Sequence, residues 1–323
     1  MFDNIDFKLK DTEATDTDFL SETPLYLDTI TGEHNFNGVP VVSGILGDLG
    51  GNHFKVTVSS TGVNIKNGSL CKYYLGDNFK TLGRSETQRA IEMLSDALHL
   101  PIDRATVTRM DIAQNFIVQN PVQVYYNHLG ELKYSTRQGV GNGIGTVETL
   151  YYYLSGGILS FYDKLKEQKD KRQPIPELYQ NRNVLRYEQR YKSRLAQTFK
   201  VERVTAAMLF DEAFYIKAID KWKDNYFNIK KINDITLNFD AMKGKTDLYN
   251  MGVLALVEMV GGELNLINQI KEAQKSGNLN KKQAYDLKQA VTAACKIKDG
   301  VTVPNDAILE LDKKVKEAVK FYR

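Results

Sequence analysis

Cysteine and histidine are scarce in this sequence, and it has no long apolar run. The two cysteines, Cys71 and Cys295, lie far apart, which excludes a disulfide framework and a cysteine-based zinc site. The four histidines are scattered and show no metal-binding pattern. The richest apolar run, MGVLALVEMVGG at 251–262, is well short of the roughly 20 residues that span a bilayer, so we expect no membrane association. Residues 1–18 are acidic where a signal peptide is basic and then apolar, which predicts an intracellular protein.

The net charge of +3 hides an uneven distribution along the chain. Residues 1–33 carry nine acids and two lysines, whereas 164–204 carry twelve Lys/Arg and five Asp/Glu. Residues 271–323 carry twelve bases and seven acids. A polyanion would be repelled by the first region and could be held by the other two. The alternative for 271–323 is that its lysine-rich helix faces are simply solvated.

The order of the expected elements predicts an α+β fold with a duplication. Alternating apolar residues in 53–66 indicate a β-hairpin, a capped amphipathic pattern in 85–98 indicates a helix, and 105–118 reads as a strand. After the glycine-rich break QGVGNGIG, two short strands at 146–154 and 158–164 precede a short helix after Pro174 or Pro176 and a strand over 183–192. These are two tandem ferredoxin-like (RRM-like) units that form a mainly antiparallel sheet.

The chain becomes helical beyond residue 201. Tyr215, Ile219 and Trp222 fall at i, i+4 and i+7, which makes the single tryptophan a packing anchor rather than a base-stacking platform. We expect an α+β domain over 1–235, built of units 1–128 and 129–200 with packing helices 201–235. A helical carboxy-terminal domain over 236–323 follows, in which Asn280 and Gln283 form a capping box.

Two strands carry the same arrangement of arginine and acid. TRMDIAQ places Arg109 and Asp111 on one strand face, and VLRYEQRYK places Arg186, Glu188 and Arg190 on another. If the two units pack side by side, both carboxylates can converge on a hard divalent cation. The alternative is that each acid pairs with an arginine of its own strand.

The stretch ILSFYDKLKEQ sets Tyr162 between an apolar run and Lys164 and Lys166. We expect Ser160, Tyr162 and Lys164 on one strand face and Leu159 and Phe161 in the core. A phenol titrates at about 10, so it becomes a nucleophile only where cations stabilise the phenolate. The chain has 18 tyrosines, so the pattern alone does not single out this one.

Three motifs together resemble a known family. TVTRMDIAQNF, LSFYDKLKEQ and NVLRYEQRYKSRL, in this order and spacing, are similar to the core motifs of the gene II/X-type phage and plasmid rolling-circle replication initiators. The resemblance is specific over about residues 105–195 and weak beyond about 235. A similar set of motifs occurs in staphylococcal-type plasmid initiators.

The resemblance implies a DNA-nicking initiator of the tyrosine-transesterase type. Tyr162 would attack a phosphodiester and form a 5′-phosphotyrosine link with a free 3′-hydroxyl that primes synthesis, assisted by Lys164. Asp111 and Glu188 would hold Mg²⁺ or Mn²⁺. The expected partner is single-stranded or extruded origin DNA in the cytoplasm of a bacterial host, with a host helicase or polymerase as a further candidate. The residues implied in DNA binding are Arg109, Lys166, Arg186, Arg190 and Arg194.

The sequence also departs from the patterns of related enzymes. It has no His-hydrophobic-His pair, the metal motif of many rolling-circle nickases, and a third metal ligand is not identified. GVGNGIG lacks the Lys-Ser/Thr of a phosphate-binding loop, so we interpret it as a connector. The Arg, His-x-x-Arg and Tyr set of a tyrosine recombinase is not found. The main rival function is non-catalytic binding of single-stranded nucleic acid, with sheet tyrosines stacked on bases. The helices of 245–323 would aid recognition of duplex origin DNA.

Overall fold

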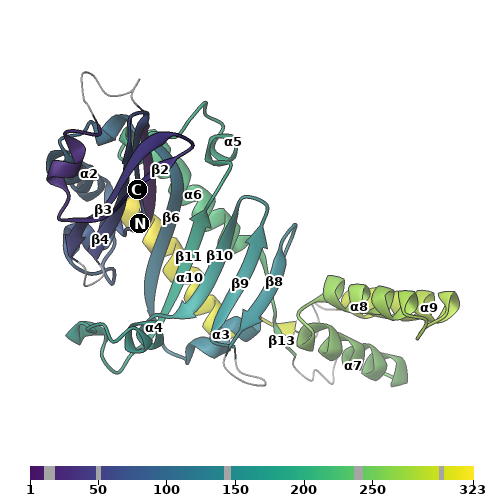
Figure 1. The fold of residues 1–323 in the computed structure, drawn as a ribbon. Coiled ribbons are helices and arrows are strands. Elements are labelled where there is room, and N and C mark those ends of the chain that lie inside the picture. The colour runs from purple at the N-terminus through teal and green to yellow at the C-terminus, as the bar shows by residue number, and fades with distance from the viewer. Residues whose placement is uncertain (11–18, 49–51, 142–146, 236–242, 298–301) are drawn as a thin grey trace.

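One antiparallel sheet of ten strands dominates the protein (Figure 1). The computed structural model describes residues 1–10, 19–48, 52–141, 147–235, 243–297 and 302–323. The predicted α+β class, with a large antiparallel sheet and a helical carboxy-terminal region, is confirmed. In their order across the sheet, the strands are β2 (Thr29–Phe36), β3 (Val39–Asp48), β4 (Asn52–Ser59), β5 (Gly62–Lys66), β1 (Phe2–Lys10), β6 (Thr106–Val118), β11 (Asn183–Tyr191), β10 (Gly157–Asp163), β9 (Thr149–Leu154) and β8 (Thr136–Val140).

The two expected units meet where their last strands pair. β6 and β11 are hydrogen-bonded neighbours in continuous register from Asn183–Val118 to Tyr191–Met110. On one side lies the first unit's hairpin β4–β5, and on the other the second unit's hairpin β9–β10. The symmetry is broken by β1, which lies between β5 and β6 and so brings the start of the chain to the centre of the sheet.

The helix of the second unit is not where the sequence predicted it. Only a 3₁₀ turn, Glu177–Tyr179, follows the two prolines, and the helix α4 (Lys164–Asp170) begins directly after β10. Asp163 caps it, because its Oδ1 accepts from the backbone N–H groups of Leu165 (2.9 Å) and Lys166 (3.0 Å). The strand therefore ends one residue before Lys164.

Helices cover one face of the sheet. α6 (Glu212–Phe227), α10 (Asp306–Tyr322) and α3 (Val122–His128) pack behind the central strands in the view of Figure 1. Trp222 is fully buried and stacks on Tyr187 with ring centroids 4.8 Å apart. Its predicted role as a packing anchor is confirmed. Leu159 and Phe161 are also buried on this side, as expected from strand alternation.

The carboxy-terminal helices differ in whether they pack against the sheet domain. α7 (Lys245–Met259), α8 (Glu263–Lys275) and α9 (Lys281–Cys295) project from the sheet, whereas α10 returns and packs against α6 and β6 (Figure 1). A short ribbon of β13 (Asp234–Ile235) and β14 (Thr302–Val303) joins the two ends of this arm. The predicted boundary at 236 falls outside the described residues. The expected capping box of Asn280 and Gln283 is present at the start of α9.

One of the remaining helices, α2 (Arg84–Leu98), has 15 residues, and the other remaining elements are short. No single helix of the described ranges is long and apolar enough to cross a bilayer, and α7 and α8 reach that composition only as a pair bent by 92°. The elements not described above are α1 (Leu70–Leu75), α2 (Arg84–Leu98), β7 (Leu129–Leu132), α5 (Leu195–Phe199), β12 (Ile229–Lys231) and the 3₁₀ turns Thr23–Tyr26, Ile102–Arg104 and Ala207–Leu209.

Candidate active site at the junction of the two units

The polar face of the central strands brings together five of the predicted site residues. Asp111 lies opposite Arg190, Glu188 opposite Ser160, and Arg186 opposite Tyr162. Opposite residues of antiparallel strands share a face, so Asp111, Glu188 and Tyr162 all lie on the side away from Trp222. Asp111 and Glu188 are diagonal neighbours on adjacent strands, a spacing of about 7–8 Å. The two carboxylates therefore share one face of the sheet, and their joint binding of a cation stays a prediction.

Asp111 is a fully buried carboxylate held by two neighbours. Arg109 Nε donates to its Oδ1 at 3.0 Å, and Asn4 Nδ2 donates to its Oδ2 at 3.1 Å. Burial raises the pKa of Asp111 above its usual range, and the charge of Glu188 raises it further, while the hydrogen bond from Arg109 opposes the shift. The side chain is therefore poised to titrate much closer to neutrality than an ordinary aspartate.

Glu188 is buried as well but stays ionised. Its Oε1 accepts from Arg190 Nε at 2.7 Å, and its Oε2 accepts from the Tyr162 hydroxyl at 3.0 Å. Arg186 Nε lies 3.5 Å from the same Oε2. Burial opposes the ionisation of Glu188, but the two guanidinium groups outweigh it and lower its pKa to about 2. Both same-strand ion pairs foreseen as the alternative are thus present, Asp111 with Arg109 and Glu188 with its two arginines.

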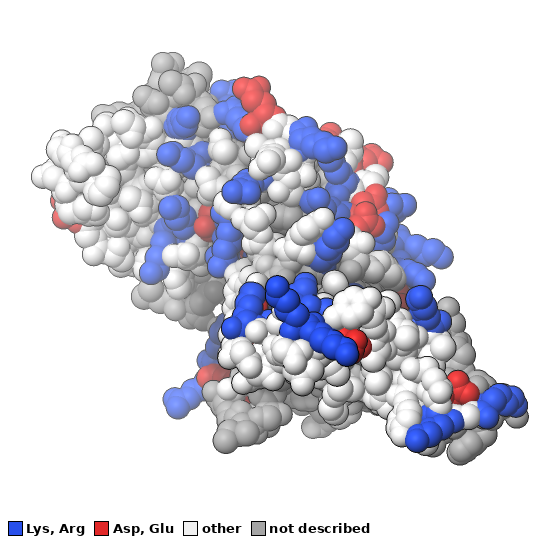
Figure 2. Space-filling view, turned by 90° about the vertical axis from the view of Figure 1, so that its right-hand side faces the viewer, with Lys and Arg blue, Asp and Glu red and all other residues white. Residues whose placement is uncertain are grey.

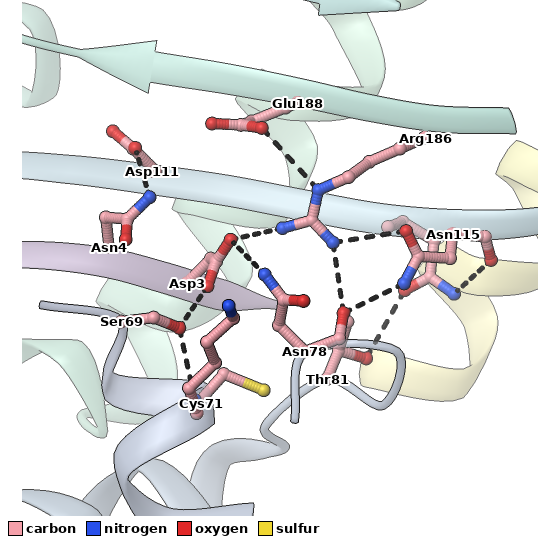
Figure 3. A network of polar contacts seen from close by, with 12 residues as sticks. Asp3, Asn4, Ser69, Cys71, Asn78, Thr81, Asp111, Asn115, Arg186 and Glu188 are labelled. Carbon is pink, nitrogen blue, oxygen red and sulfur yellow. Dashed lines mark hydrogen bonds and ion pairs between the residues drawn. The ribbon is translucent and has the colours of Figure 1, made fainter. Parts of the chain in front are cut away.

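Arg186 is the centre of a buried polar network (Figure 3). Its guanidinium forms an ion pair with Asp3 and donates to the Asn78 carbonyl and to Asn115 Oδ1, each at 3.1 Å. Ser69 and Asn78 donate to the same Asp3 carboxylate. The Arg186 side chain is 1% exposed, so it faces protein groups in this structure, and its role in DNA binding stays a prediction.

Sequence reasoning missed the contribution of β1 to this site. Asp3 and Asn4 belong to the acidic segment that we took only as a region repelling polyanions. The alternation of Phe2, Ile5 and Phe7 with polar residues in FDNIDF is a strand signal, although it says nothing of which strands β1 joins. Asn78 lies in a loop and carries no pattern that would have marked it.

Tyr162 lies at the open side of the network. Its side chain is partly exposed and lines two adjoining hollows of about 320 and 260 Å³, which also share Glu167, Lys171 and Arg190. Burial raises the pKa of the phenol well above its usual value, and the neighbouring charge of Glu188 raises it further, while Arg186 opposes the shift. The phenol is therefore neutral in this arrangement, and its hydroxyl donates a hydrogen bond to Glu188.

The basic residues near Tyr162 do not all lie where the sequence placed them. Lys164 was expected on the strand face beside Tyr162; this was wrong, because the strand ends at Asp163 and Lys164 starts α4. It is fully buried and donates to Glu167 Oε2 at 2.7 Å. Lys166 is partly exposed and pairs with Asp170 at 3.0 Å.

Arg194 stands apart from the other predicted DNA-binding residues. It is exposed and follows β11 at the end where Gly157 pairs with Tyr191, opposite to the end that carries Tyr162. Arg109 and Arg190, by contrast, line the 260 Å³ hollow together with Tyr162, and their side chains are 24% and 26% exposed. Lys171, 57% exposed, lines the same hollow, so these two arginines and Lys171 are cations that solvent can reach beside the phenol.

The donor atoms match a magnesium or manganese ion in kind but not in number. Carboxylate oxygens are the ligands such ions prefer. Within the described residues, no three Asp, Glu, His or Cys side chains gather as a metal-binding group. Both carboxylates also already accept hydrogen bonds from arginines. The residues as they stand therefore offer two ligands, each held by a guanidinium.

Comparison with protein families places this site in a known context. Residues 48–224 match the family described as the N-terminal domain of the replication-associated gene II protein, a stretch that runs from just before β4 to α6 and includes Asp111, Tyr162 and Glu188. No curated protein matches the chain. The similarity to staphylococcal-type plasmid initiators stays a prediction. Because the match covers more than half of the 323 residues, the chain belongs to the family of phage replication-associated proteins defined by the N-terminal domain of the gene II protein.

Proposed function

We propose that the protein initiates rolling-circle replication by nicking origin DNA through tyrosine transesterification. Membership of a replication-associated phage family supports a role as an initiator. The observation that carries the nicking step is the hydrogen bond from Tyr162 to Glu188, 3.0 Å long, at the wall of a hollow that solvent reaches. It joins a nucleophile to a proton acceptor at the junction of the two units.

The chemistry assigned to this geometry is an exchange of one phosphoester for another. The Tyr162 oxygen attacks the phosphorus of a phosphodiester, and its proton passes to Glu188, which is ionised and is the acceptor of its hydrogen bond. The bond between phosphorus and the 3′ oxygen breaks, and that oxygen takes up a proton from solvent. The products are a 5′-phosphotyrosine and a 3′-hydroxyl that primes synthesis. Attack by a 3′-hydroxyl on the phosphotyrosine reverses the step and rejoins the strand.

The partly exposed arginines would hold the phosphate. Arg109 and Arg190 line the hollow on the side of Tyr162 and can donate to phosphate oxygens. Lys166 and Arg194 would contact phosphates farther along the strand. Figure 2 views the molecule from the side on which the arm projects. It shows lysine and arginine side chains spread over that face, with several gathered at its centre. This distribution supports binding of a polyanion by the sheet domain and by the arm of α7–α9.

The remaining parts of the proposal concern the setting of the reaction. The substrate is single-stranded or extruded origin DNA in the cytoplasm of a bacterial host, and a host helicase or polymerase would act on the nicked product. Mg²⁺ or Mn²⁺ dependence is proposed from the oxygen ligands of Asp111 and Glu188, with Lys164 as a supporting cation. The arm would assist recognition of duplex origin DNA.

A covalent-capture experiment tests the proposal. The protein is incubated with labelled origin oligonucleotides and Mn²⁺, and an adduct is sought on a denaturing gel. Tyr162→Phe removes one oxygen and little packing, so the adduct should disappear while the fold and the affinity for DNA persist. Tyr153→Phe, one strand away, is the matched control and should form the adduct. An adduct with Tyr162→Phe would identify another tyrosine, and Tyr151 would be tested next because Tyr152 is buried on the opposite face.

A second candidate function is non-catalytic binding of single-stranded nucleic acid. The partly exposed Tyr151 and Tyr153 on the open face of β9 favour it, because exposed aromatic rings stack on bases. It predicts binding without any covalent adduct, in the wild-type protein as well as in each variant.

A further inference from the structure

The polar face continues from the candidate nick site toward the edge of the sheet. Tyr153 lies opposite Ile158, which lies opposite Arg190. One row along, Tyr151 lies opposite Ser160, which lies opposite Glu188. Because residues in register share a face, the two tyrosines look out on the same side as Tyr162.

The tyrosines of β9 differ in burial and in hydrogen bonding. Tyr152 is fully buried and its hydroxyl donates to the carbonyls of Leu129 (3.0 Å) and Gly130 (2.7 Å), so the core requires it. Tyr153 is 39% exposed, and Tyr151 is half-buried at the wall of the 320 Å³ hollow that Tyr162 also lines. Neither of these two phenols makes a hydrogen bond within the described residues. Their packing therefore does not account for them as the packing of Tyr152 does.

The two outward rings form one surface. Their centroids are 5.7 Å apart and their planes differ by 32°. Strands use tyrosine readily, so a single exposed ring would need no explanation. Here two rings stand side by side: Tyr151 is one row from Tyr162 and lines the same hollow as Arg190, and Tyr153 is one row farther along. Between them and Glu188, the buried hydroxyl of Ser160 has no hydrogen-bond partner among the described residues.

The acids that line the 320 Å³ hollow are all engaged within the protein. Each of the four acids that line it already has a partner within the protein: Glu148 and Asp170 pair with Lys166, Glu167 pairs with Lys164 and Lys171, and Asp163 caps α4. Arg190 borders both hollows and is partly exposed. A strand whose phosphate sits at Arg190 and Tyr162 would carry its neighbouring bases over β9.

We propose that Tyr151 and Tyr153 form a stacking platform for two bases of single-stranded DNA next to the scissile phosphate. The inference rests on the proposed function, since it assumes that DNA is the substrate. Single-stranded DNA fits because unpaired bases expose their faces, whereas those of a duplex are covered by their neighbours. Loss of one stacked base should weaken binding by about 5- to 150-fold.

The test measures affinity rather than cleavage, so that it does not depend on the nucleophile. Short labelled single-stranded and duplex origin oligonucleotides are titrated by fluorescence anisotropy at one salt concentration, in the Tyr162→Phe background to prevent covalent capture. Tyr151→Leu and Tyr153→Leu should each lose about 5- to 150-fold in single-strand affinity and leave duplex affinity unchanged. Tyr151→Phe and Tyr153→Phe keep the ring and should bind as the parent does.

The controls separate stacking from other effects. Tyr134→Leu removes an 86% exposed tyrosine that lies outside the platform and should change nothing. The dependence of affinity on salt should be the same in all variants, because no phosphate contact is lost. Equal affinities of the leucine and parent proteins, or equal losses for leucine and phenylalanine, would overturn the platform. A changed oligomeric state in Tyr153→Leu with unaltered DNA affinity would assign the face to protein contacts instead. If the adduct of the nicking assay is absent while the platform variants behave as stated, the proposed chemistry fails and the platform stands.

Discussion

Replacing Arg186 with methionine should destabilise the protein strongly, since its guanidinium is the common partner of two buried carboxylates. Asp3 and Glu188 are 4% and 2% exposed, and both lose their contact with it. The Asn78 carbonyl and Asn115 Oδ1 lose a donor in the same step. Breaking a buried ion pair from one side costs about 3–5 kcal/mol, because the remaining charge is left without compensation. We expect a loss of that size in the free energy of unfolding.

Urea denaturation followed by circular dichroism measures this loss. Arg182→Met, at an exposed arginine just before β11, is the matched control and should stay within about 0.5 kcal/mol of the parent. Adding Asp3→Asn to Arg186→Met removes one of the orphaned charges and should restore part of the stability. A loss below about 1 kcal/mol for Arg186→Met, or no recovery with Asp3→Asn, would refute the idea that the ion-pair network holds β1 to β11.

Three further predictions concern acid stability, the site carboxylate and the arm. Although burial opposes its ionisation, Lys164 and Lys171 lower the pKa of Glu167 to about 2 from 4.5, so the stability it contributes is present above pH 4.5 and is lost as the pH falls toward 2. Glu167→Gln should flatten that part of a stability–pH curve, and an unchanged curve would contradict the assignment. Asp111→Asn should abolish the covalent adduct on the denaturing gel and spare DNA binding; loss of both would indicate a folding role. Excision of 236–301, with the ribbon closed by a short turn, should weaken duplex binding and lower its salt dependence by about 0.9 per lost phosphate contact. Unchanged duplex affinity would point to a role of the arm in assembly or partner binding.

Local patterns predicted the parts of the site that local rules determine. Alternation along single strands placed Leu159 and Phe161 in the core and Tyr162 on the other face. The repeated Arg-x-acid pattern placed Asp111 and Glu188 on one face, once the two units were assumed to pack side by side. Both inferences need only the geometry of a strand and one assumption about pairing.

The rest of the site depends on where strands end and on contacts between residues far apart in sequence, which the residue pattern of one strand does not determine. Lys164 was misplaced because Asp163 can end a strand as well as continue it, and here the cap of α4 prevailed. Asp3 was missed because its partner, Arg186, lies 183 residues away in sequence. That α10 packs on α6 while α7–α9 project likewise follows from tertiary packing, because an apolar helix face does not specify which element covers it.

The insertion of β1 between β5 and β6 sets the order in which the site can be completed. Asp3 can bind Arg186, and Asn4 can bind Asp111, only after the later residue of each pair has been synthesised. The two contacts span 183 and 107 residues. Contacts of such long sequence separation form late in folding, because the chain loses the entropy of loop closure before the contact contributes any stabilising free energy. At about 5–20 residues per second of synthesis, roughly 10–40 s separate the emergence of the two ends of the Asp3–Arg186 pair. A nascent chain therefore carries the first unit for many seconds before a complete site can assemble around Tyr162.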